Sequence, residues 1–287
     1  MKKKKKFDKT AFMFIAPAFI LFTLFIIVPT VSSVYYSLTS WDGISPDIKF
    51  IGLANYKEIF TSDRFGNAMK NTIILTVFIS IFENTIALAL ALIVDNVRWG
   101  KNFFRSGFYI PVLISGIVSG FIWKIMYNYN FGTFNAVLGS LGLDKWKQDW
   151  LGNSSLTLLM IGVVLIWKGA GYYMIIYLAS LQSVSTDLIE AAQIDGASPI
   201  QRFKAITFTI NFTLSLINGL KVFDQINVMT DGGPGFTSET LVYLLYKVGF
   251  NEGRQGFGTA VGIMLLFIII VLNTIQQKFL RSREVQM

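Results

Sequence analysis

The sequence predicts an all-α integral membrane protein with six transmembrane helices. Of its 287 residues, 53% are hydrophobic and only 15% are charged, whereas a soluble domain carries about 25% charged residues. The apolar residues gather in long runs without any charge, such as residues 11–34 and 256–275. Runs of about 20 apolar residues match the ~30 Å hydrocarbon layer of a bilayer. The composition therefore excludes a soluble enzyme, and the same numbers exclude a disordered chain.

The chain contains no cysteine and no histidine. Disulfides, thiol nucleophiles and His-based triads are therefore excluded, together with the usual ligands of zinc, haem and iron–sulfur clusters. We expect no metal site and no catalytic group in this chain. The net charge is +8, but the basic residues stand between the apolar runs. That distribution is typical of membrane topology and not of a nucleic-acid surface.

Six apolar segments are expected to span the membrane. The first contains Pro17 and Pro29 and is too long for the apolar core of a signal peptide, so we interpret it as a retained helix. The fifth runs for only 16 residues before Lys221 interrupts it, and such a helix rises about 24 Å, which is short of a full span. Either Lys221 and Asp224 lie in a polar cavity, or this segment is broken or abnormally short. The six segments cover residues 11–34, 72–94, 106–127, 156–181, 205–220 and 256–275.

Six spans place both termini on one side of the membrane. Of the 25 Lys and Arg residues, fourteen fall on the side of the termini, eight on the other side and three within spans. The positive-inside rule therefore predicts that both termini are cytoplasmic. We expect a cytoplasmic basic tail (1–10), a transmembrane domain (11–280) and a second cytoplasmic tail (281–287). The loop 183–204, between the fourth and fifth spans, is then also cytoplasmic.

This cytoplasmic loop has the pattern of a helix, a glycine turn and a second helix. Asp187 and Glu190 have the spacing of a capping box, with Asp in the place of Ser or Thr. Gly196 can adopt the left-handed conformation that ends a helix. Ser198 is a good N-cap, and Pro199 suits the first helical position. The alternative interpretation is an ordinary amphipathic connector, which the local pattern leaves open.

Several ordered motifs resemble one family of membrane proteins. The string EAAQIDGAS at 190–198 resembles the EAA signature of the membrane subunits of binding-protein-dependent ABC importers, and is similar to the carbohydrate branch of that family. Residues 50–56, 222–224 and 229–241 resemble the FxGLxNY, FD and MTxGGP patterns of the same branch. The N-terminal layout and residues 41–43 resemble the MalF/UgpA-type subunit and not its MalG-type partner. The resemblance covers nearly the whole chain.

The resemblance implies a type I ABC importer permease fold, in which this chain forms half of a translocation path for a sugar or oligosaccharide. It implies a second, MalG-like permease subunit, a homodimeric cytoplasmic ATPase that holds ATP and magnesium, and an extracellular or periplasmic sugar-binding protein. The chain itself then holds no cofactor, hydrolyses nothing and lies in the bacterial plasma membrane among lipids. The loop 183–204 becomes a coupling helix that docks on the ATPase. The residues that this analogy assigns to coupling are Asp187, Glu190, Ala191, Ala192, Asp195 and Gly196.

The fifth span departs from the family pattern. Relatives usually carry a proline after the Ile-Thr-Leu or Ile-Thr-Phe that closes the EAA motif, but here Phe208 is followed by Thr209. The distance from there to 222–224 is about two helical turns shorter than in relatives, which agrees with the short fifth span. Either residues have been deleted from the chain or the sequence lacks some of them, and we favour the second explanation.

Polar and aromatic residues within the spans are candidates for the translocation path. A buried ionisable group costs several kcal/mol unless it is paired or hydrated. We expect Lys124 and Lys168 to extend toward an interface, and Lys221 and Asp224, three residues apart, to pair on one helical face. Glu83 faces either the pore or the partner subunit. Aromatic residues are also common at membrane interfaces for structural reasons. The path candidates are Glu83, Asn84, Trp167, Tyr172, Tyr173, Asn218, Lys221, Asp224 and Gln225.

The glycine-rich segment 231–235 is not a phosphate-binding loop, because no Gly-Lys-Ser/Thr sequence opens a helix there. We interpret it as a fixed outer turn and expect the ATPase to be a separate chain. Three other functions remain open at this point. They are an ABC permease for another small solute, a self-contained secondary transporter or channel, and an intramembrane enzyme that uses carboxylates alone.

Overall fold

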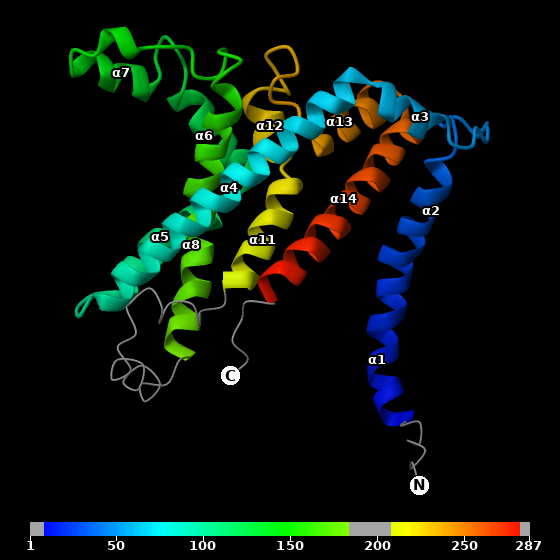
Figure 1. Ribbon diagram of the computed structural model, residues 1–287, viewed down its shortest axis with the longest axis horizontal. Coiled ribbons are helices and arrows are strands. Elements are labelled where there is room, and N and C mark those ends of the chain that lie inside the picture. The colour runs from blue at the N-terminus through cyan, green and yellow to red at the C-terminus, as the bar shows by residue number, and fades with distance from the viewer. Residues whose placement is uncertain (1–8, 184–207, 282–287) are drawn as a thin grey trace. The chain divides into compact units, whose positions relative to one another are not determined.

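The computed structural model describes residues 9–183 and 208–281. All the named secondary-structure elements in that part are helices (Figure 1). The coupling residues that we predict in the loop 183–204 lie outside the described residues. The chain divides into two compact units. The first contains residues 1–61 and 245–264, and the second contains residues 62–244 and 265–287.

The first unit begins with one long rod made of α1 (Lys9–Phe22), a π-helical turn η1 (Thr23–Ile27) and α2 (Val28–Tyr36). Its residues Met13–Tyr36 are long and apolar enough to cross a membrane, as predicted. Pro29 lacks a backbone donor, yet the helix continues through it, and two nearby hydroxyls donate to helix carbonyls. The Oγ1 of Thr30 donates to the Ile26 carbonyl at 2.7 Å, and the Oγ of Ser33 donates to the Pro29 carbonyl at 2.8 Å.

The end of this rod is fastened to α3 (Ala54–Thr61) and to the start of α14 (Gln255–Arg281). The amide of Asn55 donates to the carbonyls of Ser37 and Thr39, each at 2.8 Å. The backbone N–H of Gly256 donates to the Trp41 carbonyl at 2.8 Å. These bonds satisfy backbone carbonyls of residues 37–41, which follow the end of α2. A π-helical turn η3 (Lys247–Asn251) precedes α14.

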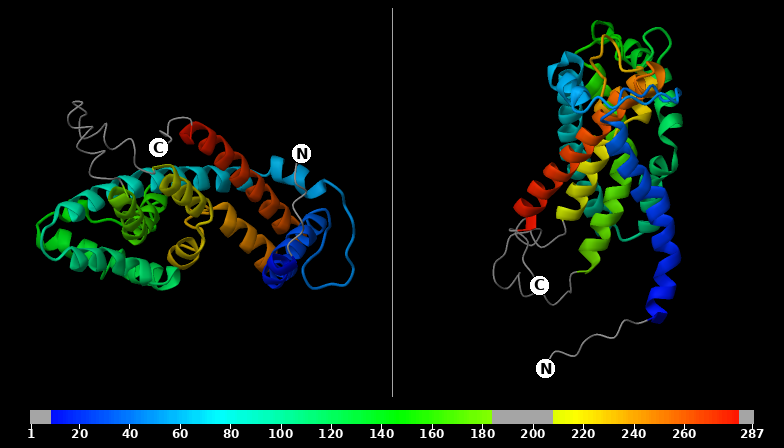
Figure 2. Two further views of the ribbon diagram at one scale, coloured as in Figure 1. Left: turned by 90° about the horizontal axis from the view of Figure 1, so that it is seen from below. Right: turned by 90° about the vertical axis from the view of Figure 1, so that its right-hand side faces the viewer.

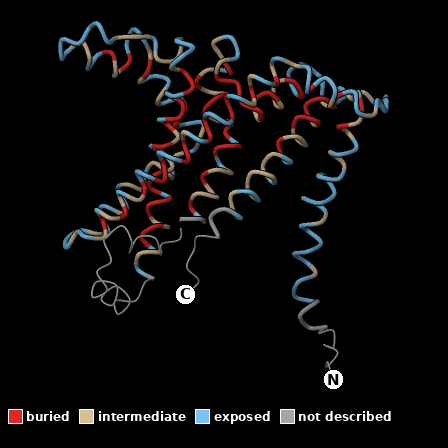
Figure 3. Tube along the Cα trace, in the orientation of Figure 1, coloured by how far each residue is buried: buried red, intermediate tan, exposed pale blue. Residues whose placement is uncertain are grey.

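The second unit is built on three helices that pack side by side: α4 (Asp63–Asn96), α8 (Thr157–Ser183) and α11 (Phe208–Leu220) (Figure 2). The α4–α8 contact is close because glycines stand where the helices meet. A Cβ added to Gly162 would lie 2.7 Å from the Phe78 ring. Small residues at helix contacts are the usual way in which helices approach one another in a membrane. Figure 3 shows the buried residues concentrated along these helices.

Our prediction of one continuous third span at 106–127 is wrong. The structure has α5 (Lys101–Leu113) and α6 (Gly116–Met126), which are bent by 93° at the break between them. The chain breaks there because Ile114 is extended and Ser115 starts a new helix, its Oγ accepting from the Val118 N–H at 3.2 Å. Two short helices, α7 (Thr133–Ser140) and the single 3₁₀ turn η2 (Asp144–Trp146), follow before α8.

In the described part of the fifth span, α11 contains 13 residues and rises only about 20 Å. It therefore does not cross a membrane alone, and its predicted first residues lie outside the described part. Four helices of the described residues are long and apolar enough to span, and the bent pair α5–α6 makes a possible fifth. The membrane-helix class is confirmed by these elements.

The glycine-rich segment forms the fixed turn that we predict. It connects α12 (Asp224–Met229) to α13 (Leu241–Tyr246), and Gly232 and Gly235 both have positive φ. The Oγ of Ser238 donates to the Gly233 carbonyl at 2.6 Å. Beyond the turn, the buried Glu239 receives two hydrogen bonds from the Arg64 guanidinium, at 2.8 and 2.9 Å. This bidentate pair ties the turn to the first helical turn of α4.

Candidate functional site

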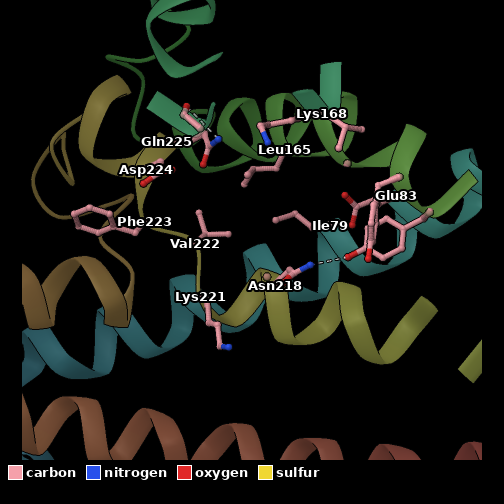
Figure 4. A pocket seen from close by; sticks show the side chains of 16 residues that line it. Ile79, Glu83, Leu165, Lys168, Asn218, Lys221, Val222, Phe223, Asp224 and Gln225 are labelled. Carbon is pink, nitrogen blue, oxygen red and sulfur yellow. Dashed lines mark hydrogen bonds between the residues drawn. The ribbon is translucent and has the colours of Figure 1, made fainter. Parts of the chain in front are cut away.

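A cavity of about 460 Å³ lies in the second unit, between α4, α8 and the broken α11–α12 segment (Figure 4). Its volume is in the range of sites that bind small organic molecules. Its lining combines aliphatic, aromatic, amide and charged side chains. The lining residues are Ile79, Glu83, Val112, Gly116, Leu165, Lys168, Gly169, Tyr172, Tyr173, Asn218, Gly219, Lys221, Val222, Phe223, Asp224 and Gln225.

The cavity exists where it does because the chain stops being helical between Leu220 and Asp224. α11 ends at Leu220, α12 begins at Asp224, and the intervening Phe223 has a non-helical backbone (φ −134°). The Oγ1 of Thr240 donates a hydrogen bond to the Val222 carbonyl at 3.0 Å. This polar contact makes a broken helix tolerable at membrane depth, because freed backbone groups need partners there.

This break also corrects our expectation that Lys221 and Asp224 pair on one helical face. The two residues stand on opposite sides of the break, and Figure 4 shows their side chains extending in different directions. No ion pair joins them in the described part of the chain. The correction has a simple reason: the three-residue spacing brings side chains together only on a continuous helix.

Glu83 supplies one wall of the cavity. Its side chain is buried, with 4% exposure, and it forms no hydrogen bond to any residue that the structure describes. It is directed at α8, where a Cβ added to Gly169 would collide with its Oε1. The carboxylate can occupy this position only because residue 169 has no side chain. Lys168 is also on the cavity lining, so the expectation that it extends to an interface is wrong.

The opposite wall carries hydroxyl and amide groups. The Asn218 amide donates to the Tyr173 hydroxyl at 3.0 Å, as the dashed line in Figure 4 marks. The Tyr172 ring meets the Tyr173 ring edge-on, with centroids 5.2 Å apart. Tyr173 is buried whereas Tyr172 is 38% exposed. The wall therefore presents both hydrogen-bonding groups and an accessible aromatic ring.

The bend between α5 and α6 closes the cavity at its third side. The amide of Gln225 donates to the Ser119 Oγ at 3.3 Å and to the Gly116 carbonyl at 3.4 Å. A Cβ added to Gly116 would overlap the Asp224 side chain. α12 can therefore lie across the start of α6 only because that helix begins with glycine. On the outer side of α6, the Nζ of Lys124 donates to the Val228 carbonyl at 2.9 Å.

Two of the nine path candidates do not line the cavity. Asn84 is buried within the helix contact, where it donates to Ser215 and accepts from Tyr177. Trp167 packs edge-on against Trp123, with centroids 5.4 Å apart. The other seven candidates, Glu83, Tyr172, Tyr173, Asn218, Lys221, Asp224 and Gln225, are brought together by the fold.

The sequence prediction missed Gly116 and Gly169 as residues that shape the cavity. The run Gly169-Ala170-Gly171 in the middle of an apolar span was a usable signal, because small residues in membrane helices mark close approach. Gly171 agrees with it, since a Cβ there would overlap the Phe108 carbonyl. Gly116 carried a similar signal, because Gly116 and Gly120 are spaced four residues apart in the third predicted span.

The arrangement is suited to binding a polar solute. Two acidic and two basic side chains share the lining with amides and tyrosines, which gives many hydrogen-bonding groups. Such a wall of mixed polar and aromatic groups is able to hold a hydroxyl-rich solute.

Residues 83–284 match the family model described as "Binding-protein-dependent transport system inner membrane component". The chain belongs to this family. It is 33% identical, over the whole length of both chains, to the probable starch degradation products transport system permease protein AmyD of Thermoanaerobacterium thermosulfurigenes. It is 31% identical to the sn-glycerol-3-phosphate transport system permease protein UgpA of Agrobacterium fabrum, over 95% of this chain and 94% of that one.

The fold of this chain is similar to that of one chain in a solved bacterial ABC transporter. A bacterial alginate ABC transporter, crystallised in complex with alginate pentasaccharide-bound periplasmic protein, contains a chain that superposes with a TM-score of 0.82. That chain is 23% identical, and the match covers 96% of this chain and 95% of the other. The alignment with AmyD runs over 297 positions against the 287 residues here, so AmyD has at least ten residues without a counterpart.

Proposed function

We propose that this chain is one of two permease subunits that form the translocation path of an ABC importer for a sugar or oligosaccharide. The observation that supports the proposal most is the cavity beside Glu83, which collects seven of the nine residues chosen from the sequence as path candidates. Its hydroxyl, amide and aromatic groups match the edges and faces of a sugar ring. The name of AmyD, which refers to starch degradation products, agrees with this substrate class.

The proposal includes partners that the chain requires for activity. A MalG-like permease supplies the other half of the path, and an extracellular or periplasmic binding protein delivers the sugar. A homodimeric cytoplasmic ATPase binds ATP with magnesium and drives the cycle. In this arrangement the chain has six spans, both termini are cytoplasmic, and the loop 183–204 is the helix that docks on the ATPase. The residues that would transmit the motion of the ATPase to the permease are Glu190, Ala191, Ala192 and Gly196. Asp187 and Asp195 belong to the same coupling segment.

The charge of the cavity separates the main proposal from its nearest alternative. UgpA is named for sn-glycerol-3-phosphate, so a phosphorylated solute is the alternative substrate class within the family. A path for a dianion should carry an excess of positive charge. Here Glu83 and Asp224 stand beside Lys168 and Lys221 on the lining, so the lining is not exclusively basic, which favours a neutral saccharide.

The test is to purify the chain from its own membranes in mild detergent and to identify the proteins that accompany it. A second permease and an ATPase are expected. The assembled complex is then reconstituted, and ATP hydrolysis is measured with the binding protein and a panel of neutral sugars, acidic sugars and phosphorylated polyols. Stimulation by neutral sugars supports the proposal. Recovery of the chain alone, active in solute flux without ATP, would establish a self-contained carrier or channel instead.

The coupling role is tested by Gly196→Val, because a β-branched residue resists the left-handed turn that we expect there. Sugar uptake should fall by about tenfold or more while the two permeases and the ATPase still copurify. Gly142→Val is the matched control, since Gly142 also has a positive φ (70°) and open space around it but lies in the loop before η2. Undiminished uptake by Gly196→Val would remove the coupling role and leave an ordinary connector.

A further inference from the structure

The turn that joins α4 to α5 concentrates basic and aromatic side chains at the end of two membrane helices (Figure 1). Gly100, with a φ of 77°, reverses the chain there. Trp99 is 88% exposed and Phe103 is 77% exposed, while Arg98, Lys101 and Arg105 are placed among them. We call these five side chains, Arg98, Trp99, Lys101, Phe103 and Arg105, the basic–aromatic turn.

The positive charge of this turn is only partly neutralised. Lys101 pairs with Asp95, with 3.1 Å between its Nζ and the nearer carboxylate oxygen. Arg98 and Arg105 form no ion pair with any residue in the described ranges 9–183 and 208–281. The Nε of Arg105 is buried and has no hydrogen-bond partner in that part of the chain. The Arg105 side chain as a whole is partly exposed, so the rest of its guanidinium is able to contact an anionic acceptor from outside the chain.

Two further features point to the chemistry of that acceptor. No side chain caps the first turn of α5, and the first backbone N–H groups of a helix have no partner within it. Guanidinium groups favour the planar, multidentate contacts that phosphate oxygens offer. The aromatic side chains are exposed beside these groups, which is the combination typical of the boundary between lipid headgroups and acyl chains.

The position of the turn decides between a lipid and a soluble anion. α4 is a candidate membrane span, and α5 belongs to the bent pair that makes another. The connection between two spans lies at a membrane surface, where anionic headgroups are concentrated. We propose that the basic–aromatic turn binds an anionic phospholipid, with Arg98 and Arg105 on the headgroup phosphate and Trp99 and Phe103 at the start of the acyl chains.

The experiment uses Trp99 as its own reporter in the assembled transporter. Complexes are reconstituted into bilayers with a graded mole fraction of brominated phosphatidylglycerol or brominated phosphatidylcholine, and the fluorescence of a matched Trp99→Phe complex is subtracted. Brominated phosphatidylglycerol should quench Trp99 at a lower mole fraction than brominated phosphatidylcholine. Each basic residue near an anionic surface changes the preference by about fivefold, so the double variant R98Q/R105Q should weaken it by about 30-fold.

The matched control removes two exposed lysines elsewhere, in the double variant K49Q/K145Q, which changes the net charge equally. It should retain the preference of the unmodified chain. Equal quenching by both lipids in the unmodified complex would overturn the proposal, and so would a preference that R98Q/R105Q retains. If brominated lipid quenches Trp99 in the isolated chain but not in the complex, a partner protein covers the turn and the proposal is also wrong. A failure of sugar transport would not affect these readouts, because they do not depend on the substrate.

Discussion

Glu83 and Asn84 are neighbours on α4 and both side chains are buried, yet their surroundings are opposite. Asn84 uses its whole amide. It donates to the Ser80 carbonyl at 2.8 Å and to the Ser215 hydroxyl at 2.7 Å, and it accepts from Tyr177 at 2.8 Å. Glu83 faces the cavity without a hydrogen bond to any described residue.

The difference separates two uses of buried polarity in a membrane protein. A side chain whose hydrogen bonds are all made within the protein holds helices together. A side chain that lacks them keeps its capacity for a ligand or for water. The contact around Asn84 joins α4, α8 and α11, whereas Glu83, one residue away, lines the cavity that we propose as part of the path. Each of the following variants tests this division.

The largest effect is expected from Gly169→Ala, because one methyl group collides with the Glu83 carboxylate. Overpacking of this kind costs about 1–3 kcal/mol, so sugar uptake should fall by about tenfold or more. Gly66→Ala adds the same methyl group to α4 where nothing lies within 4 Å, and it should leave uptake unchanged. Equal uptake by both variants would show that Gly169 does not set the position of Glu83. The double variant G169A/E83A should recover the melting temperature that G169A loses.

Asn84→Leu should reduce the free energy of unfolding by about 1–3 kcal/mol, because the Ser215 and Tyr177 hydroxyls lose a buried partner. Uptake per folded complex should change little. Thr85→Val is the matched control, since Thr85 is exposed on the same helix and bonds only to the Ile81 carbonyl of its own helix. Denaturation in detergent measures both. If Asn84→Leu keeps its stability but loses transport, Asn84 has a role in the path and not in helix packing.

Glu83→Gln should have the reverse signature. The shape of the side chain is kept, but the carboxyl group that faces the cavity is replaced by an amide. We expect the KM for a neutral sugar to rise by about three- to tenfold, which is within the range of one lost charge-assisted hydrogen bond. Thermal unfolding should be unchanged. A loss of stability with an unchanged KM would give Glu83 the structural role that we assign to Asn84.

The smallest effect is expected from Trp167→Phe. Trp167 packs against Trp123 outside the cavity lining, and phenylalanine keeps an aromatic ring at the contact. Uptake should change by less than about twofold, because one edge-on ring contact contributes only about 0.5–1.5 kcal/mol and most of it is kept. A tenfold change in KM with normal abundance would return Trp167 to the list of residues that touch sugar.

The sequence was sufficient to predict the membrane class and much of the cavity wall, because both depend on the composition of individual helices. Long uncharged runs identified the spans at 11–34 and 256–275, and polar groups within the apolar segments identified Glu83 and Asn218. These signals are local, since an apolar environment makes any polar residue conspicuous.

The errors arose where the result depends on contacts between helices. The bend at Ile114 and Ser115 was missed because Pro and Gly are tolerated within membrane helices and do not by themselves indicate a break. The predicted pairing of Lys221 with Asp224 assumed a continuous helix. Lys168 was expected at an interface because its neighbours across the cavity are distant in sequence. Gly169 has no chemistry of its own, and its importance appears only when the Glu83 side chain is seen against it.

α4 is long enough to connect features at its two ends. Its 34 residues form one helix, about 51 Å long. Near one end, Arg64 holds Glu239 of the glycine-rich turn, and near the other end, Asp95 holds Lys101 at the start of α5. A rod of this length that tilts by about 10° about its middle displaces each end by about 4 Å in opposite directions. A tilt of α4 would therefore move the glycine-rich turn and the start of α5 in opposite directions, while the cavity wall near the middle of the helix moved least.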